Sequence, residues 1–326
     1  MSRAGTPFRK GRRTDSWQGV LNVLKPPGLT SHEVVLWARR CLGQRHLGHA
    51  GTLDAPAAGV LLLCLGQATR LVEFLQETPK VYRAEMTLGV RTDTLDATGT
   101  VQSTTSVPHL TGADVAAVLP QFRGEIEQIP PLFSAKRQQG RRWHELARQG
   151  ETPTRRSQRV TIYELTLRHF LPGEHPRAIL EVTCSKGTYL RSLCADLGEA
   201  LGCGALLSFL VRTQVGPYTL AEALTLEELA AIHRAGRLRE YLVPLAEALP
   251  HLPRVVVDPT AAEKLAQGQR LPAESGPPPQ LTQARALVRL CDQQQRLLAL
   301  GRWEERAGRW WYQPCKVFVN LVEENP

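Results

Sequence analysis

GHAGTLDAPAAGVLLLCLG, residues Gly48 to Gly66, joins a glycine- and proline-containing loop to an unbroken apolar segment. The apolar part, Val60 to Leu65, predicts a buried strand. Glycines allow backbone angles that other residues avoid, so the loop can hold its one carboxylate, Asp54, in front of a ligand on a rigid base. An aspartate in such a loop is more often a turn residue that bonds nearby backbone amides. The pattern alone therefore favours a turn, with catalysis as the second interpretation.

Length and charge limit the class of protein. At 326 residues the chain exceeds one typical domain, so we expect a large and a small domain. The balance of 40 Lys and Arg against 31 Asp and Glu gives a formal charge of +9, which indicates a polyanionic partner, either nucleic acid or an anionic membrane surface. No apolar run approaches the ~20 residues of a membrane span, and the basic N-terminus lacks the apolar core of a secretory signal. We therefore expect a cytoplasmic protein with no membrane partner.

The seven cysteines and nine histidines form no metal-binding pattern. The sequence contains no C-x-x-C pair and no H-E-x-x-H string, and several cysteines lie within apolar runs. This distribution favours buried, reduced thiols over a zinc site or a disulfide framework. We expect no metal.

Periodicity and turn residues predict the local elements. Strands are expected at 19–24, 80–89 and 180–184, and helices at 31–42, 68–77, 111–122 and 190–201. Ser31 is the expected N-cap of the first helix. Helices are expected to join two domains between about 216 and 249, and strands at 254–258, 286–292, 296–301 and 310–319 with a helix at 259–267 predict a small β-barrel.

Two segments are rich in positive charge. Residues 1–17 carry five basic residues and few apolar ones, which predicts a basic disordered arm. Between Lys136 and Arg159 eight basic residues face only two acidic ones, with Trp143 and His144 interleaved. A charge run is usually a solvated face, but this one also suits a groove that follows RNA phosphates.

The residues from Gly48 to Asp54 resemble the catalytic loop of the TruB family of tRNA pseudouridine synthases, whose G-H-x-G-T-L-D string contains the essential nucleophile. The family usually has proline directly after this aspartate. Here Ala55 intervenes and Pro56 follows. The resemblance raises catalysis by Asp54 above the turn interpretation.

Further strings resemble the same family, in the same order. They are K-P-P-G-L-T-S at 25–31, K-V-Y at 80–82, R-T-D-T-L-D-A-T-G at 91–99, Q-I-P-P-L-F-S-A-K at 128–136, C-S-K-G-T-Y-L-R at 184–191 and L-V-R-T at 210–213. One such string is a weak indication, whereas several in order are a strong one.

The resemblance implies a role for individual residues. Asp54 is the nucleophile, Arg191 pairs with it, and Tyr82 stacks on a flipped base. Tyr189 packs against that base, Leu210 lines the uracil pocket and His49 takes part in base flipping. The alternatives from the residues alone are a core tyrosine at 82, a surface arginine at 191 and a backbone-bonded loop histidine at 49. Asp93 and Asp96 are interpreted as turn residues.

The resemblance also implies the fold and its division. We expect an α+β pseudouridine synthase fold with a mixed, largely antiparallel sheet flanked by helices, and a small C-terminal PUA-like β-barrel. The expected boundaries are 1–17 for the arm, 18–249 for the catalytic domain and 250–326 for the PUA-like RNA-binding domain. Arg302, Arg306, Arg309, Trp303, Trp310 and Trp311 would give that domain an RNA-binding surface, unless the tryptophans form its core.

The implied activity is the isomerisation of uridine to pseudouridine in tRNA, at uridine 55 of the T loop, by a monomeric enzyme. This exchange of one glycosidic bond for another involves no redox change, so no cofactor is expected. Three alternatives stay open: a non-catalytic RNA-binding or RNA-folding protein, a guide-RNA-dependent pseudouridine synthase, and a nucleotide enzyme with a phosphate-binding loop. The last lacks a G-x-x-x-x-G-K-[ST] string.

Overall fold

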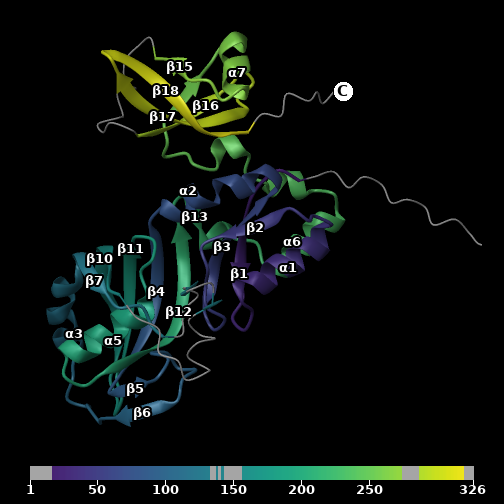
Figure 1. Cartoon of the computed structure of the whole chain (residues 1–326). Coiled ribbons are helices and arrows are strands. Elements are labelled where there is room, and N and C mark those ends of the chain that lie inside the picture. The colour runs from purple at the N-terminus through teal and green to yellow at the C-terminus, as the bar shows by residue number, and fades with distance from the viewer. Residues whose placement is uncertain (1–16, 133–136, 139–140, 143–155, 274–285, 319–326) are drawn as a thin grey trace, which may run out of the picture.

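The computed structural model of the protein describes residues 17–132, 137–138, 141–142, 156–273 and 286–318. A large twisted sheet carries helices on its faces, and a smaller curled sheet lies beyond one end of it (Figure 1). The large sheet contains β1 (Gly19–Lys25), β2 (Leu47–Ala50), β3 (Ala58–Leu65), β4 (Lys80–Leu88), β7 (Gly124–Gln128), β10 (Gln158–Leu171), β11 (Arg177–Cys184), β12 (Ala205–Val215) and β13 (Tyr218–Thr219).

Helices and short turns connect these strands. The α-helices are α1 (Ser31–Leu42), α2 (Val72–Glu77), α3 (Gly112–Val118), α5 (Leu190–Ala200) and α6 (Leu226–Arg234). The 3₁₀ turns are η1 (Gly66–Leu71), η2 (Leu119–Phe122), η3 (Leu220–Glu222), η4 (Leu238–Tyr241) and η5 (Leu245–Glu247). Two small ribbons pair β5 (Val90–Thr92) with β6 (Val101–Thr104) and β8 (Arg137–Gln138) with β9 (Arg141–Arg142).

The main path of the large sheet runs β1-β3-β12-β4-β11-β10-β7, with β2 on β3 and β13 on β12. Every pairing among these strands is antiparallel except that between β12 and β3. The expected α+β class with a mixed, largely antiparallel sheet is therefore confirmed.

Strand β3 is buried along its whole length because both of its faces are covered. Leu61, Leu63 and Leu65 pack with α1 and α6 in one hydrophobic cluster. Val60 and Leu62 pack on the opposite side, in a cluster that also contains residues of α2 and of the C-terminal sheet. A strand covered on both faces needs apolar side chains at every position, which explains the unbroken run in the sequence.

The other half of the large sheet has one covered face. Tyr82, Ala84, Met86 and Leu88 of β4 share a cluster with α3 and α5, whereas the residues between them are exposed or half-buried. This alternation confirms the predicted strand and its inward-facing side chains.

The two halves meet at a short joint. There β12 pairs in parallel with the start of β3, through Val211 with Ala58 and Arg212 with Gly59. The loop from Gly51 to Ala57 leads into this joint. The fold thus places the Asp54 loop on the line where the two half-sheets join.

Several element ends differ from the sequence-based expectations. The N-cap of α1 is Thr30, whose hydroxyl accepts a hydrogen bond from the Glu33 amide at 3.1 Å. Ser31 is instead the first helical residue, so its prediction as N-cap was wrong. The segments expected as helices at 68–77 and 111–122 are each part α-helix and part 3₁₀ turn. The helix expected up to 201 ends at Ala200.

The C-terminal unit is a curled, half-barrel sheet in the order β14-β16-β17-β18-β15. Its elements are β14 (Arg254–Val256), α7 (Pro259–Ala266), β15 (Leu271–Pro272), β16 (Leu287–Cys291), β17 (Leu297–Arg306) and β18 (Arg309–Val317). Trp303 is 3% exposed and stacks on Trp310 with ring centroids 3.7 Å apart. A place in the core of the unit is therefore confirmed for Trp303 and Trp310, whereas Trp311 is not part of that core cluster. The PUA-like identity of the unit stays a prediction.

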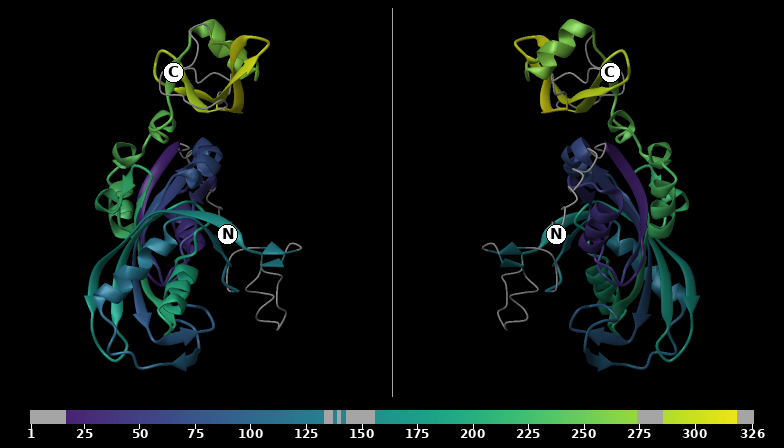
Figure 2. Two further views of the ribbon diagram at one scale, coloured as in Figure 1. Left: turned by 90° about the vertical axis from the view of Figure 1, so that its left-hand side faces the viewer. Right: turned by 90° about the vertical axis from the view of Figure 1, so that its right-hand side faces the viewer.

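The C-terminal unit lies beyond one end of the large sheet (Figure 2), and polar and apolar contacts join the two near α2. The Lys316 ammonium lies 2.8 Å from the Glu73 carboxylate, and Arg70 donates to the carbonyl of Val317. Leu300 and Phe318 belong to the same hydrophobic cluster as Val60 and Leu62. The small sheet is therefore packed onto the larger one.

Two expectations fall wholly or largely outside the described residues: the basic arm, and the basic groove between Lys136 and Arg159. Among the helices that the structure describes, none has the length and apolar character needed to cross a membrane.

Gly59 offers a direct test of the joint between the half-sheets. Its φ is +118°, and a Cβ there would lie 2.2 Å from the carbonyl oxygen of Arg212. Gly236 also has a positive φ, +73°, but no heavy atom lies within 4 Å of a Cβ at that position. We expect Gly236→Ala to lower the free energy of unfolding by about 1 kcal/mol, and Gly59→Ala by more than about 3 kcal/mol.

Urea unfolding followed by circular dichroism would measure both variants. Equal losses for the two alanines would contradict a close backbone approach at the joint.

Candidate active site

A cavity of about 410 Å³ opens where the half-sheets join. Four segments form its walls: the loop before β3, the step from α2 into β4, the loop from β11 into α5, and β12. The lining residues are Gly51, Thr52, Leu53, Asp54, Gln76, Lys80, Tyr82, Ser185, Lys186, Gly187, Thr188, Tyr189, Leu190, Arg191, Leu207, Leu210 and Arg212. Segments more than 150 residues apart in sequence therefore meet in one site.

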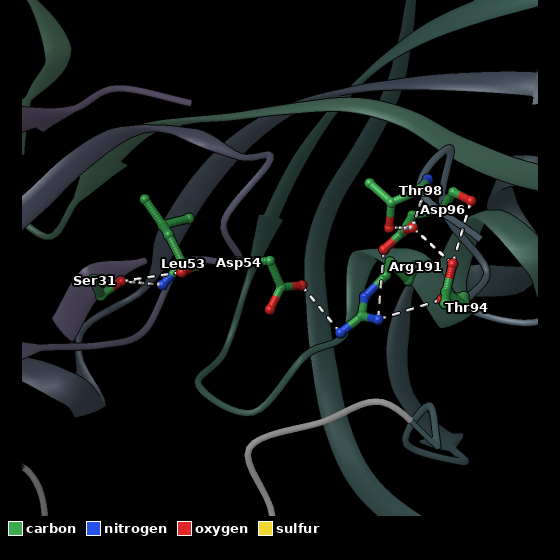
Figure 3. A network of polar contacts seen from close by, with 7 residues as sticks. All are labelled: Ser31, Leu53, Asp54, Thr94, Asp96, Thr98 and Arg191. Carbon is green, nitrogen blue, oxygen red and sulfur yellow. Dashed lines mark hydrogen bonds and ion pairs between the residues drawn. The ribbon is translucent and has the colours of Figure 1, made fainter. Parts of the chain in front are cut away.

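Asp54 and Arg191 form an ion pair at this cavity, with 3.0 Å between Asp54 Oδ2 and Arg191 Nη2 (Figure 3). The Asp54 side chain is 49% exposed and that of Arg191 only 7%. The expected pairing is therefore present in the structure, and the carboxylate remains open to a ligand. Arg191 lies in the first turn of α5 and is buried, so the surface-arginine alternative was wrong.

Asp96 holds the other side of the same guanidinium, with its Oδ2 3.6 Å from Arg191 Nη1. Its Oδ1 accepts hydrogen bonds from the Thr94 hydroxyl at 2.7 Å and from the Thr98 amide at 3.0 Å (Figure 3). Asp96 is thus a turn residue, as predicted. It also orients Arg191, a role that sequence reasoning missed because the two lie 95 positions apart.

Ser31 fixes the backbone immediately before Asp54. Its hydroxyl accepts a hydrogen bond from the Leu53 amide at 2.8 Å and donates to the Leu53 carbonyl at 3.1 Å (Figure 3). Both residues are at least 97% buried. The K-P-P-G-L-T-S segment, residues 25–31, therefore supports the Asp54 loop through the backbone of Leu53.

Lys25 reinforces the same brace. Its ammonium is completely buried and donates to the carbonyls of Pro26, Leu29 and Ala55. Burial lowers the pKa of this amine from 10.5 to about 8, although the nearby Asp54 carboxylate acts in the opposite direction. Ala55, which stands where the family usually has proline, thus contributes its backbone carbonyl to the brace.

Arg212 also holds this loop, through its guanidinium group. Only 1% exposed, it donates from Nε to the Val60 carbonyl at 2.7 Å and from Nη2 to the Gly51 carbonyl at 3.0 Å. Nη1 lies 3.4 Å from the Thr52 carbonyl. Sequence reasoning gave Arg212 no role, since a lone arginine in a strand carries no spacing that points to a loop some 150 residues earlier.

Tyr82, Tyr189 and Leu210 all line the cavity with Asp54. Tyr82 is 8% exposed and belongs to the core of the sheet, which confirms the core interpretation. It also reaches the cavity, and its stacking on a flipped base stays a prediction. Burial raises the pKa of its phenol. Tyr189 is fixed by Gln128, whose side chain bonds both its amide (2.9 Å) and its carbonyl (3.0 Å).

His49 is not among the residues that line this cavity. It lies in β2, opposite Leu63 of β3. Burial, and next the positive charge of Arg212, lower its pKa below the ordinary value of 6.5. The structure therefore brings five of the six expected site residues to the cavity wall and leaves His49 in β2, the strand that precedes the loop.

The arrangement suits chemistry on a planar, neutral group. A half-exposed carboxylate can act as a nucleophile when its approach is fixed and its charge is balanced, and here Arg191 balances it. Aromatic and apolar walls from Tyr82, Tyr189 and Leu210 can enclose a base. Within the described residues, no three His, Cys, Asp or Glu side chains are grouped so as to hold a metal ion.

Known proteins are similar in sequence to this chain over most of its length. Residues 39–190 match the family described as TruB family pseudouridylate synthase (N terminal domain), and residues 191–250 match the tRNA pseudouridylate synthase B C-terminal domain. A protein of Symbiobacterium thermophilum named tRNA pseudouridine synthase B is 52% identical over 77% of this chain and 82% of its own. The chain belongs to the TruB family. A second relative of that name, from Moorella thermoacetica, is 44% identical over 92% of this chain and 98% of its own.

Solved structures of known proteins are similar to this chain in fold. A Cbf5-Nop10-Gar1 complex contains a chain that is similar to this TruB-family protein, with a TM-score of 0.70, 29% identity, and coverage of 92% of this chain and 85% of that one. An H/ACA RNP bound to a substrate RNA containing 2′-deoxyuridine gives a TM-score of 0.69 and 27% identity, with 93% and 85% covered. The expected pseudouridine synthase fold is thereby confirmed.

Ser31 and Thr30 form a matched pair for testing the brace. Ser31→Ala removes the hydroxyl that bonds the buried amide and carbonyl of Leu53, whereas Thr30→Ala removes the cap of α1. We expect each variant to lose about 1–2 kcal/mol of unfolding free energy. Only Ser31→Ala should also lower the rate of pseudouridine formation, by about tenfold, because it lets the Asp54 carboxylate at the cavity shift, and a small displacement of a reacting group is costly.

Single-turnover pseudouridine formation and urea unfolding, measured on both variants, separate the two effects. An equal loss of rate in Thr30→Ala would show that the rate follows stability and not the position of Asp54.

Proposed function

We propose that this protein isomerises uridine 55 in the T loop of tRNA to pseudouridine, with Asp54 as the nucleophile. The observation that carries the proposal is the 3.0 Å ion pair between the open Asp54 carboxylate and the buried Arg191. It lies in a cavity whose other walls include Tyr82, Tyr189 and Leu210. The enzyme acts as a cytoplasmic monomer.

The reaction exchanges the bond from ribose C1′ to uracil N1 for a bond from C1′ to uracil C5. Because substrate and product are isomers, the exchange consumes no oxidant or reductant and needs no cofactor. The protein must supply a nucleophile and an enclosure in which the detached uracil turns without escaping. Asp54 fills the first role, and the walls formed by Tyr82, Tyr189 and Leu210 fill the second.

A uridine inside a folded T loop must leave its stack before it can enter this cavity, at a cost of a few kcal/mol. Tyr82 is placed to stack on the flipped base, and Tyr189 and Leu210 to enclose it. His49 assists the flip from its position on β2, five residues before Asp54, although it does not line the cavity.

The choice of tRNA as substrate is supported by the relatives. Proteins named tRNA pseudouridine synthase B are 52% and 44% identical to this chain, whereas the chains of the Cbf5-Nop10-Gar1 complex and the H/ACA RNP are 29% and 27% identical. The greater similarity favours a tRNA enzyme over a guide-RNA-dependent one.

We divide the chain into two functional domains at the expected boundaries. We assign catalysis to residues 18–249 and an RNA-binding role to the PUA-like unit of residues 250–326. The match to the TruB C-terminal domain ends at residue 250, where the C-terminal sheet follows, which supports this division. On the small sheet, the Arg270 guanidinium lies 4.9 Å from the ring centre of Trp311 and offers a positive, aromatic surface to RNA.

Asp54→Asn is the decisive variant. We expect it to abolish turnover but to leave the affinity for tRNA within about tenfold, because phosphate contacts dominate binding. Tritium release from tRNA labelled at uracil C5 measures turnover, since C5 loses its hydrogen when the new bond forms. Filter binding of unmodified tRNA measures affinity, and a loss of binding parallel to the loss of activity would contradict the assignment.

The position is tested with the same assay. Wild-type enzyme should release one equivalent of tritium per tRNA, and none from a transcript in which uridine 55 is replaced by cytidine. Release from the substituted transcript would show that another uridine is the target. Tight tRNA binding without release by the wild type would favour a non-catalytic or guide-dependent protein.

A further inference from the structure

Lys80 is a buried charge in the cavity to which the proposed function assigns no role. It begins β4 two residues before Tyr82, lines the cavity and is only 5% exposed. Burying an ammonium group costs folding free energy unless acceptors replace its water shell. A buried lysine at the wall of a reaction cavity therefore invites a functional explanation.

A comparison with Lys25 shows what is unusual about Lys80. An ammonium group has three N–H donors. Lys25 directs its donors to three backbone carbonyls, and it does not line the cavity. Among the described residues Lys80 has two acceptors, the carbonyls of Gln76 and of Thr78, the latter at 2.6 Å. The contacts of Lys25 fully explain it as a brace, whereas for Lys80, which lines the cavity, the described residues supply acceptors for only two of its three donors.

The charges around Lys80 make this part of the wall positive. The buried Arg212 guanidinium lies on the neighbouring strand β12, and Lys186 follows β11 at the cavity rim. Two groups act in the opposite direction and raise the pKa of Lys80: the Cys184 thiol of β11 and the Glu77 carboxylate at the end of α2. Burial first, and then the charge of Arg212, lower the pKa of Lys80 from 10.5 to about 8.

The burial of Lys80 indicates whether its ammonium contacts an RNA phosphate or the flipped base. Phosphates of a folded RNA remain on its solvated surface, and a 5% exposed ammonium lies away from that surface. The group that enters the enclosed part of the cavity is the flipped base itself. Lys80 lines the same cavity as Tyr82 and Leu210, so a uracil ring enclosed by those two residues has the Lys80 ammonium in its surrounding wall.

We propose that Lys80 is a catalytic residue that stabilises the negative charge of the detached uracil. The inference rests on the proposed function. Asp54 forms a bond to C1′ as the C1′–N1 bond breaks, and the electron pair of the broken bond stays with uracil, shared by N1, O2 and O4. After the ring turns, C5 forms the bond to C1′ and the Asp54–C1′ bond breaks, with its electron pair returning to the carboxylate. The C5 hydrogen leaves as a proton, and N1 takes up a proton. A fixed cation at a carbonyl oxygen lowers the energy of the anionic stage.

Three substitutions separate this role from a purely structural one. Both acceptors of Lys80 belong to the end of α2 and its cap, so Lys80 also ties that helix to β4. Lys80→Arg keeps the charge and the donors, Lys80→Gln keeps N–H donors without charge, and Lys80→Met keeps neither. A structural tie needs donors, whereas an electrostatic role needs charge.

We expect Lys80→Gln and Lys80→Met to lower the single-turnover rate on unmodified tRNA by about 10²–10³-fold, with tRNA affinity unchanged. Lys80→Arg should retain most of the rate. The wild-type rate should fall as the pH rises through about 8, because the ammonium loses its proton there. Lys80→Arg should lack that part of the fall. Lys25 also titrates near pH 8 but is unchanged in this variant, so the difference between the two profiles isolates Lys80.

A wild-type rate in Lys80→Gln would overturn the inference, because donors alone would then suffice. Equal losses in all three variants with lowered melting temperatures would overturn it in favour of a packing role. The absence of tritium release by the wild-type enzyme would instead refute the proposed function, so the two failures are distinguishable.

Discussion

The buried guanidinium of Arg212 joins the two halves of the structure at the point where the site forms. The half-sheets have separate hydrophobic cores and meet through a parallel pairing of only two residue pairs. Backbone pairing of that length gives little rigidity, and the side chain of Arg212 adds bonds to the carbonyls of Gly51 and Val60. The loop that carries Asp54 is therefore fixed by the same residue that links the two half-sheets.

The site is built around buried positive charge. Lys25, Lys80, Arg191 and Arg212 are each at most 6% exposed. Arg191 has two carboxylates beside it, whereas the contacts shown for Lys25, Lys80 and Arg212 are mainly with backbone carbonyls. Buried cations compensated by dipoles alone cost stability. The surrounding cores, in which β3 is covered on both faces, provide the rigidity that keeps these charges in place.

Position-specific differences between expectation and structure have a common physical origin. Thr30 and Ser31 are both good capping residues, and the choice between them depended on Leu53, which occupies the Ser31 hydroxyl. Asp96 had the pattern of a turn residue, and only the fold brings it to 3.6 Å from the Arg191 guanidinium. His49 shares a short sequence string with Asp54, yet it pairs with β3 as part of β2 and does not line the cavity. Each outcome depended on a neighbour distant in sequence.

Elements with a local pattern could be predicted from the sequence: the buried run of β3, the alternating face of β4, the apolar stripe of α5 and the loop that contains Asp54. Hydrophobic periodicity and glycine placement act over a few residues, so they can be interpreted without a partner. Tertiary structure alone decided that Arg212 and Ser31 hold the Asp54 loop, that Asp96 orients Arg191, and that Lys80 faces the cavity. Ion pairs and hydrogen bonds between distant segments have no period in the sequence, because their geometry exists only once the half-sheets have joined.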